Sequence, residues 1–104
     1  MITHIVCWKY KPDISEEQRS DHIAKLRALA DVVPGTVSFS VGKDILHLDR
    51  SFDTGLVGVY KNMDALDAYT DHPEHQKVAA LGREISKQVV SVDFEHGNGS
   101  EPML

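Results

Sequence analysis

The sequence predicts an α+β fold in which a four-stranded antiparallel sheet carries helices on one face. Four segments have the apolar patterns of strands, and the stretches between them repeat apolar residues at the spacing of amphipathic helices. The order of these segments is β-α-β-β-α-β, with the second helical stretch broken in two. That order is the split β-α-β, or ferredoxin-like, pattern.

The first strand is expected at residues 2–10. Apolar groups occupy both of its faces, which indicates that neither face is simply in contact with water. Cys7 is expected to be a buried, inert thiol in this strand, since no base is adjacent in sequence. The even positions of the strand are Ile2, His4, Val6, Trp8 and Tyr10, and the odd positions include Ile5 and Cys7.

A helix is expected to begin at Ser15 and to run to about Val32. Ser15 and Gln18 form a capping-box pattern, and the two acidic residues after Ser15 suit the positive end of the helix dipole. Pro34-Gly35 ends the helix. The apolar stripe consists of Ile23, Leu26, Leu29, Ala30 and Val33, and His22 at its edge is expected to be a residue of the pocket rim.

Three further strands complete the predicted sheet, at residues 36–43, 53–61 and 88–95. Each has apolar residues on at least one face, and in a monomer one sheet face would be left without helices. An apolar patch of this size on a water-facing surface indicates a partner, and the simplest partner is a second copy packed sheet against sheet. The residues assigned to this open face are Ile5, Cys7, Leu56, Tyr60, Val90, Val92 and Phe94.

The stretch from Tyr69 to His75 is the most informative part of the sequence. Pro73 suits the first turn of a helix, where its missing N–H costs nothing. We therefore expect a short helix from Met63 to about Thr70, a break, and a second helix from Pro73 to about Lys87.

His75 is expected on the apolar face of this second helix, three and seven residues before Val78 and Gly82. His72 is expected at the helix cap. It is therefore poorly placed to share a metal ion with His75, and no third ligand is evident, so no metal site is expected. A titratable imidazole held against the core near Tyr69 suits acid–base chemistry.

The composition places the chain in an ordinary class of globular protein. It has 104 residues, 41% hydrophobic and 26% charged, which predicts one domain over residues 1–96 and a frayed tail at 97–104. The formal charge of −5, without a basic patch, argues against nucleic acid, and no run of like charge or long apolar stretch favours a membrane. A cytoplasmic location is expected, since no signal peptide is evident.

The sequence resembles the stress-responsive A/B barrel domain family, a branch of the dimeric α+β barrels. The most specific matching piece is His-Pro-x-His after a tyrosine. The matches span about residues 2 to 95 and comprise Ile2–Pro12, Val33–Gly35, Val41–Asp44, Ala68–His75 and Val90–Phe94.

The resemblance implies a homodimer and a pocket between sheet and helices. One plant relative, olivetolic acid cyclase, is a polyketide cyclase that uses a histidine and a tyrosine, and the matching positions here are His75 and Tyr69. His4 matches a further pocket histidine. Gly55 and Leu26 replace another histidine and a tyrosine of that pocket, so the substrate is not carried over.

His75 is thus the candidate base and Tyr69 the candidate hydrogen-bond donor in a pocket for a small apolar or aromatic compound. No cofactor is expected. Three functions stay open: a cyclase- or lyase-like acid–base enzyme acting on a carbonyl compound, a stress-related binding or structural dimer without turnover, and a monooxygenase, cofactor-independent or haem-using. The other expected pocket residues are His4, Val6, Trp8, His22, Leu26, Phe39, Val57 and Leu66.

Overall fold

A computed structural model describes residues 1–97 of the chain. The expected frayed tail lies outside these residues, apart from Gly97. The secondary structure follows the predicted order. The elements are β1 (Ile2–Tyr10), α1 (Glu16–Arg27), β2 (Thr36–Lys43), β3 (Thr54–Tyr60), α2 (Met63–Asp71), α3 (Pro73–Ile85) and β4 (Ser86–Glu95).

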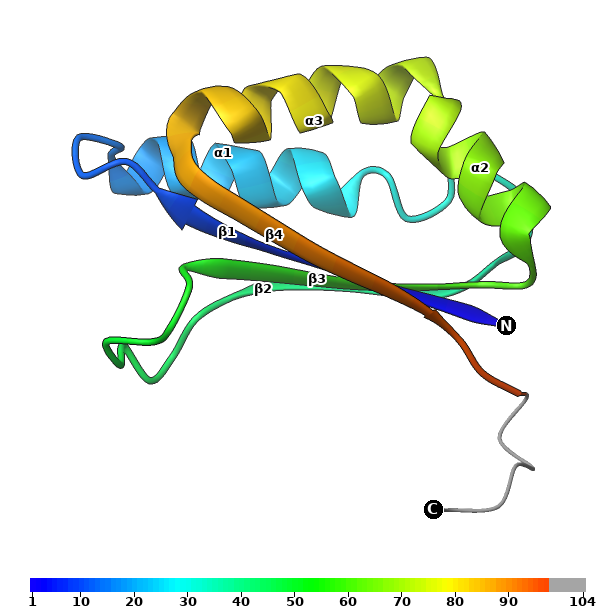
Figure 1. The fold of residues 1–104 in the computed structure, drawn as a ribbon. Coiled ribbons are helices and arrows are strands. Elements are labelled where there is room, and N and C mark those ends of the chain that lie inside the picture. Colours follow the sequence, from blue (N-terminus) through cyan, green and yellow to red (C-terminus); the bar gives the residue numbers. More distant parts are fainter. Residues whose placement is uncertain (98–104) are drawn as a thin grey trace.

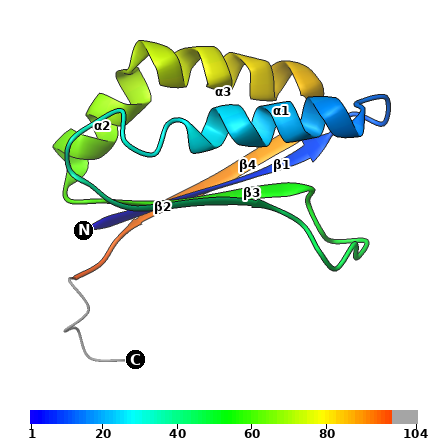
Figure 2. The same cartoon turned by 180° about the vertical axis from the view of Figure 1, so that it is seen from behind.

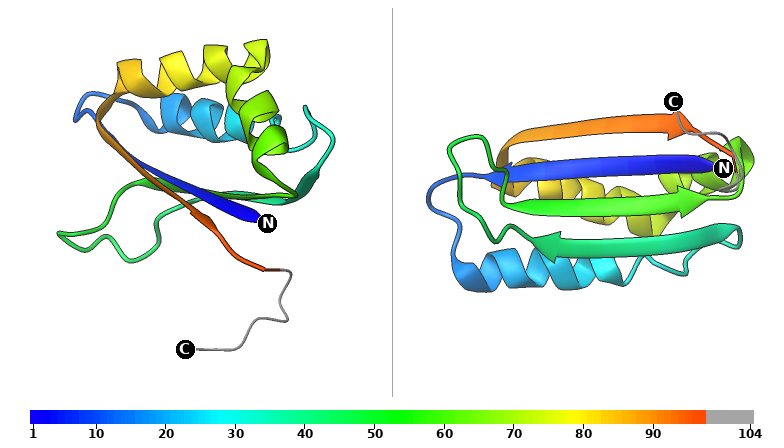
Figure 3. Two further views of the ribbon diagram at one scale, coloured as in Figure 1. Left: turned by 45° about the vertical axis from the view of Figure 1, so that its right-hand side comes forward. Right: turned by 90° about the horizontal axis from the view of Figure 1, so that it is seen from below.

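The four strands form one antiparallel sheet in the order β2-β3-β1-β4. All three helices lie on the same side of it, with α1 and α3 along the strands and α2 at one end (Figures 1 and 2). The opposite side of the sheet carries no helix (Figure 3). This is the predicted ferredoxin-like α+β architecture. No helix within residues 1–97 has both the length and the apolar character needed to cross a bilayer.

The strand register corrects the assignment of two residues to the open face. Leu56 and Tyr60 are 2% and 0% exposed and belong to the core beneath the helices. In the β1–β3 ladder Ile2 lies opposite Tyr60, and Ile5 lies opposite Val57. Residues directly opposite each other in neighbouring strands share a sheet face. Ile2 is buried under the helices, so Tyr60 is too, and Val57 lies with Ile5 on the open face.

The open face is nevertheless apolar, as expected. Val57, Val90, Val92 and Phe94 are 41%, 41%, 52% and 46% exposed in the single chain. Phe94 and Val92 lie opposite Thr3 and Ile5 in the β1–β4 ladder, so these side chains form one continuous surface.

The first helix begins as predicted but ends earlier. Ser15 caps it, and both hydrogen bonds of the capping box with Gln18 are present. The helix ends at Arg27 rather than near Val32. The chain then continues in tight turns, in one of which the Leu29 N–H donates to the Leu26 carbonyl at 3.0 Å. Two consecutive valines before Pro34 disfavour a continued helix here.

The last helix and strand meet at a different residue from the one expected. The helix ends at Ile85 rather than near Lys87, and the strand begins at Ser86 rather than Gln88. Ser86 has an extended backbone and pairs with Tyr10 across the sheet.

Candidate functional site

The break between α2 and α3 determines how His75 is held. His72 caps α3, as expected, and its Nδ1 accepts a hydrogen bond from the Glu74 N–H at 3.1 Å. In a continuous helix that N–H would bind the Thr70 carbonyl. The carbonyl is free instead, and it accepts hydrogen bonds from His75 Nδ1 at 2.9 Å and from Gln76 Nε2 at 2.6 Å. Because a carbonyl only accepts, the His75 proton sits on Nδ1 and the lone pair is on Nε2.

His75 opens onto a cavity of about 240 Å³ between the sheet and the helices. The walls come from β1, β3 and β4 on the sheet side and from all three helices on the other. Most of the lining is apolar, with the two candidate residues and His4 among the polar groups. The lining residues are His4, Val6, Trp8, Leu26, Leu56, Tyr69, His75, Ala79, Arg83, Val89 and Ser91.

The structure brings Tyr69, His75 and His4 together from three elements. The ring centroids of Tyr69 and His75 are 4.5 Å apart, and those of His4 and Tyr69 are 6.1 Å apart. Tyr69 is 1% exposed and also packs against Tyr60. A ligand in the cavity can therefore touch a phenol and two imidazoles at once.

Burial determines the protonation states of His75 and Tyr69. Desolvation lowers the pKa of His75, the hydrogen bond to Thr70 opposes this, and nearby positive charge including that of Arg83 lowers the pKa further. Desolvation raises the pKa of Tyr69 to about 12, with the neighbouring Tyr60 opposing part of the rise. Near neutral pH the site thus offers a neutral imidazole that can accept a proton and a phenol that can donate a hydrogen bond.

Asp93 is a member of the site that the sequence analysis missed. It lies opposite His4 in the β1–β4 ladder, and its Oδ1 is hydrogen-bonded to His4 Nδ1. A carboxylate on Nδ1 holds the proton there and turns the other ring nitrogen outward from the pair. The alternation of side chains along β4 already placed Asp93 on the same sheet face as Val89 and Ser91. Its partner, His4, becomes evident only from the register of β4 against β1.

Six of the ten predicted site residues line the cavity: His4, Val6, Trp8, Leu26, Tyr69 and His75. Phe39 and Leu66 do not. Phe39 packs against the Tyr69 ring at 6.0 Å, and Leu66 is buried in the core.

The expected positions of His22 and Val57 are wrong. His22 is not at a rim: it is 0% exposed, its ring packs edge-on against Trp8, and its Nδ1 lies 2.8 Å from the Tyr10 hydroxyl. It lies four residues before Leu26 and therefore on the core side of α1. Val57 lies on the open face of the sheet, away from the cavity.

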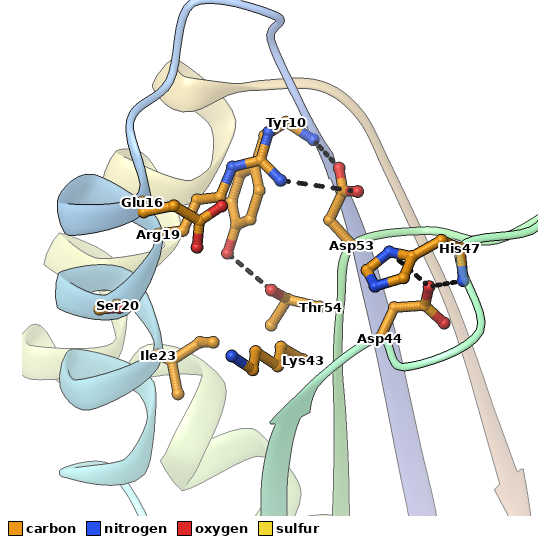
Figure 4. Close-up of a pocket in the computed structure, with 10 residues that line it drawn as sticks. All are labelled: Tyr10, Glu16, Arg19, Ser20, Ile23, Lys43, Asp44, His47, Asp53 and Thr54. Carbon is orange, nitrogen blue, oxygen red and sulfur yellow. Dashed lines mark hydrogen bonds and ion pairs between the residues drawn. The ribbon is translucent and has the colours of Figure 1, made fainter.

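A second, more polar pocket of about 300 Å³ lies between α1 and the loop joining β2 to β3 (Figure 4). It contains none of the predicted site residues. Arg19 pairs with Asp53 at 3.8 Å, and Asp44 accepts a hydrogen bond from the His47 N–H at 2.7 Å. These contacts tie the loop to α1 and to itself, so much of the charge in this pocket has a structural role.

Within residues 1–97 no group of three or more His, Cys, Asp or Glu side chains is placed to hold a metal ion. Cys7 is half-buried rather than buried, and it lies on the open face of the sheet opposite Gly55 and Val90.

Comparison with known proteins gives consistent results for family and fold. A family model described as the stress responsive A/B barrel domain matches residues 2–96. The solved structures with this fold include a dimeric ferredoxin-like protein of unknown function from Thermobifida fusca, with 25% identity, a TM-score of 0.82, and coverage of 89% of this chain and 88% of that one.

Two further solved structures illustrate the range of proteins with this fold. A hydroxynitrile lyase from Passiflora edulis has 20% identity, a TM-score of 0.81, and coverage of 97% and 96% of the two chains. A Dabb family protein from Mesorhizobium loti has 17% identity, a TM-score of 0.74, and coverage of 93% and 97%. No curated protein matched the sequence.

Proposed function

The chain belongs to the stress responsive A/B barrel domain family, and from this premise we propose that it is a cofactor-independent acid–base enzyme acting on a small carbonyl compound. The substrate occupies the cavity between sheet and helices, His75 is the base, and Tyr69 is the hydrogen-bond donor. The observation that carries the proposal is the tautomer of His75, a residue that lines the cavity: because Nδ1 donates to the Thr70 carbonyl, Nε2 is unprotonated and can accept a proton.

The proposed step is removal of a proton from the carbon beside the carbonyl. The C–H bond breaks, the proton moves to Nε2 of His75, and the electron pair passes to the carbonyl oxygen as an enolate. Tyr69, which is itself buried, donates a hydrogen bond to the oxygen that becomes negative. The enolate then attacks a second carbonyl or expels a leaving group, and His75 returns its proton to the product.

The support for this chemistry is local. Desolvation keeps the His75 imidazole neutral and the Tyr69 phenol protonated, which are the states that the step requires. The likeness to the Passiflora hydroxynitrile lyase extends to the fold alone, and it supports the proposal only in that this fold can accommodate a lyase.

The proposal can be tested without knowing the natural substrate. Acetophenone in D₂O exchanges its methyl protons when a base removes them, and NMR follows the exchange. We expect the protein to accelerate this exchange, His75→Ala to lose about 10²–10⁴-fold of the acceleration, and Tyr69→Phe to lose about 10²–10³-fold.

His47→Ala is the matched control, since His47 is an exposed histidine in the β2–β3 loop. This variant should accelerate the exchange of the methyl protons of acetophenone as much as the wild type does. If acetophenone raises the melting temperature but its exchange is not accelerated, the protein is a binding module without turnover, and the catalytic proposal is wrong.

We also propose that the protein is a homodimer that joins through the open sheet face. That face exposes Val57, Val90, Val92 and Phe94 in the single chain, and the Thermobifida protein with this fold is dimeric. Light scattering should give twice the chain mass. Val92→Glu should yield monomers because it places charge in the middle of the interface, whereas a dimeric Val92→Glu would exclude this surface.

A further inference from the structure

The cavity contains one feature that the proposed acid–base step does not use, the guanidinium of Arg83. Arg83 lies in the last turn of α3, eight residues after His75 and four after Ala79. Residues spaced by four lie on one side of a helix, so these three form one row along the cavity wall. Helical side chains lean toward the N-terminus, which directs Arg83 back along the row toward His75.

Arg83 is available to a ligand. Among residues 1–97 it makes no ion pair and no side-chain hydrogen bond. None of the residues lining the cavity is an aspartate or a glutamate. Asp93 lies beside the cavity residue His4, and its carboxylate is hydrogen-bonded to that imidazole.

The other residues that line the cavity indicate what kind of molecule can bind at Arg83. Val6, Leu26, Leu56, Ala79 and Val89 provide apolar contacts, with Trp8 beside them. The other polar side chains of the lining are His4, Ser91 and the proposed catalytic pair, His75 and Tyr69. A cavity with this distribution suits a molecule with an apolar body, a carbonyl at one end and a negative group at the other.

We propose that the substrate is a carboxylate, and that Arg83 binds its negative group while the carbonyl lies at His75 and Tyr69. This inference rests on the proposed function and names the class of its substrate: an apolar or aromatic keto acid, or an aldehyde acid, with the carboxylate remote from the reacting carbonyl. Arginine suits this role because its planar guanidinium can bind both oxygens of a carboxylate. Arg83 is a specificity-determining residue in this scheme, and it takes no part in proton transfer.

A second consequence follows from the position of Arg83 near the base. Its positive charge contributes to the lowered pKa of His75. A bound carboxylate offsets that charge, so the imidazole becomes a better proton acceptor when the correct substrate is present. An uncharged analogue leaves the charge of Arg83 uncompensated.

A cation in the last turn of a helix also interacts favourably with the helix dipole, and this role needs no ligand. The two roles make different predictions. A dipole contact affects stability and does not discriminate between ligands. A carboxylate site discriminates between an acid and its neutral ester.

The experiment compares 4-acetylbenzoate with its methyl ester, which differ in charge and share the ring and the ketone. Calorimetric titration of the wild-type protein should give at least ten-fold tighter binding for the acid. Arg83→Gln should remove that preference and keep the affinity for the ester. Lys77→Gln is the matched control, since Lys77 lies on the same helix, carries the same charge and does not line this cavity; it should keep the preference of the wild type.

The outcomes separate this inference from the proposed function. If the ester binds as well as the acid, or if Arg83→Gln keeps the preference, the inference is wrong and the acid–base proposal stands. If Arg83→Gln and Lys77→Gln lose the preference equally, general surface charge is responsible and the inference is again wrong. If neither compound binds the wild type, the cavity does not accept an aromatic keto acid and the inference is wrong, while the exchange of acetophenone decides the acid–base proposal separately.

Discussion

His22 gives the sharpest prediction about stability, because it is an imidazole buried completely in the core. Its Nδ1 lies 2.8 Å from the Tyr10 hydroxyl, and its Nε2 has no hydrogen-bond partner among residues 1–97. Burial lowers the pKa of His22 to about 4. The folded protein therefore keeps this side chain neutral at pH values where the unfolded chain protonates it.

The size of the effect follows from the two pKa values. The unfolded chain binds a proton at His22 as the pH falls through about 6.5, whereas the folded protein binds it only near pH 4. The free energy of unfolding is therefore unaffected above pH 6.5 and falls between these limits by up to about 1.4 kcal/mol per pH unit. Between pH 7 and pH 5 the expected loss from His22 is about 2 kcal/mol.

Urea unfolding at pH 7 and pH 5 measures this loss directly. His22→Asn keeps a polar partner for Tyr10 and does not titrate, and His47→Asn removes an exposed histidine as the control. The wild type and His47→Asn should each lose about 2 kcal/mol more than His22→Asn on going from pH 7 to pH 5. All proteins are compared at one concentration, since self-association shifts apparent stability.

Equal pH-dependent losses in the wild type and in His22→Asn would refute the reasoning. They would mean that His22 titrates alike in the folded and unfolded chain and is therefore in contact with water. A general loss of stability in His22→Asn does not affect the comparison, because only the difference between the two pH values within each protein is used.

Three other substitutions test the packing and the polar pair of the cavity. Gly82→Ala should lower the free energy of unfolding in urea by about 1 kcal/mol, since its Cβ would lie 2.7 Å from Trp8 Nε1 and overpacking outweighs the gain in helix propensity; a stabilised variant would contradict this packing. Leu26→Ala should cost about 2–5 kcal/mol and enlarge the cavity, and an unchanged melting temperature would show that Leu26 is not buried. Asp93→Asn should change the ring tautomer of His4 in ¹⁵N NMR spectra, unless the pair does not form in solution.

Local sequence patterns were sufficient to predict the order of helices and strands, because the pattern of each element depends only on residues within the same segment. The capping box at Ser15 and the break at Pro73 are of this kind. The alternation in β3 correctly separated Leu56 and Tyr60 from Val57, but it could not say which set meets the helices. That choice depends on pairing with β1, which is distant in sequence.

The same distinction applies to the site. The position of His75 followed from helical phase and the proline, which are local. Asp93 and Arg83 join the site through the packing of β4 and α3 against residues far away in the chain. The position of His22 was predicted wrongly because a residue at the edge of a helical stripe can lie either at the rim of a pocket or in the core. The element packed against the helix determines which of the two occurs. Here Gly82 of α3 has no side chain and leaves room for the imidazole in the core.

The helix break also determines how firmly His75 is oriented. Its Nδ1 donates to the Thr70 carbonyl, a main-chain group that is present whatever side chain a neighbouring position carries. His4 is oriented by the side chain of Asp93 instead, so a single substitution at Asp93 removes its partner. The two cavity imidazoles therefore differ in how they tolerate mutation of their surroundings: one neighbouring substitution can release His4, whereas the backbone keeps His75 in place.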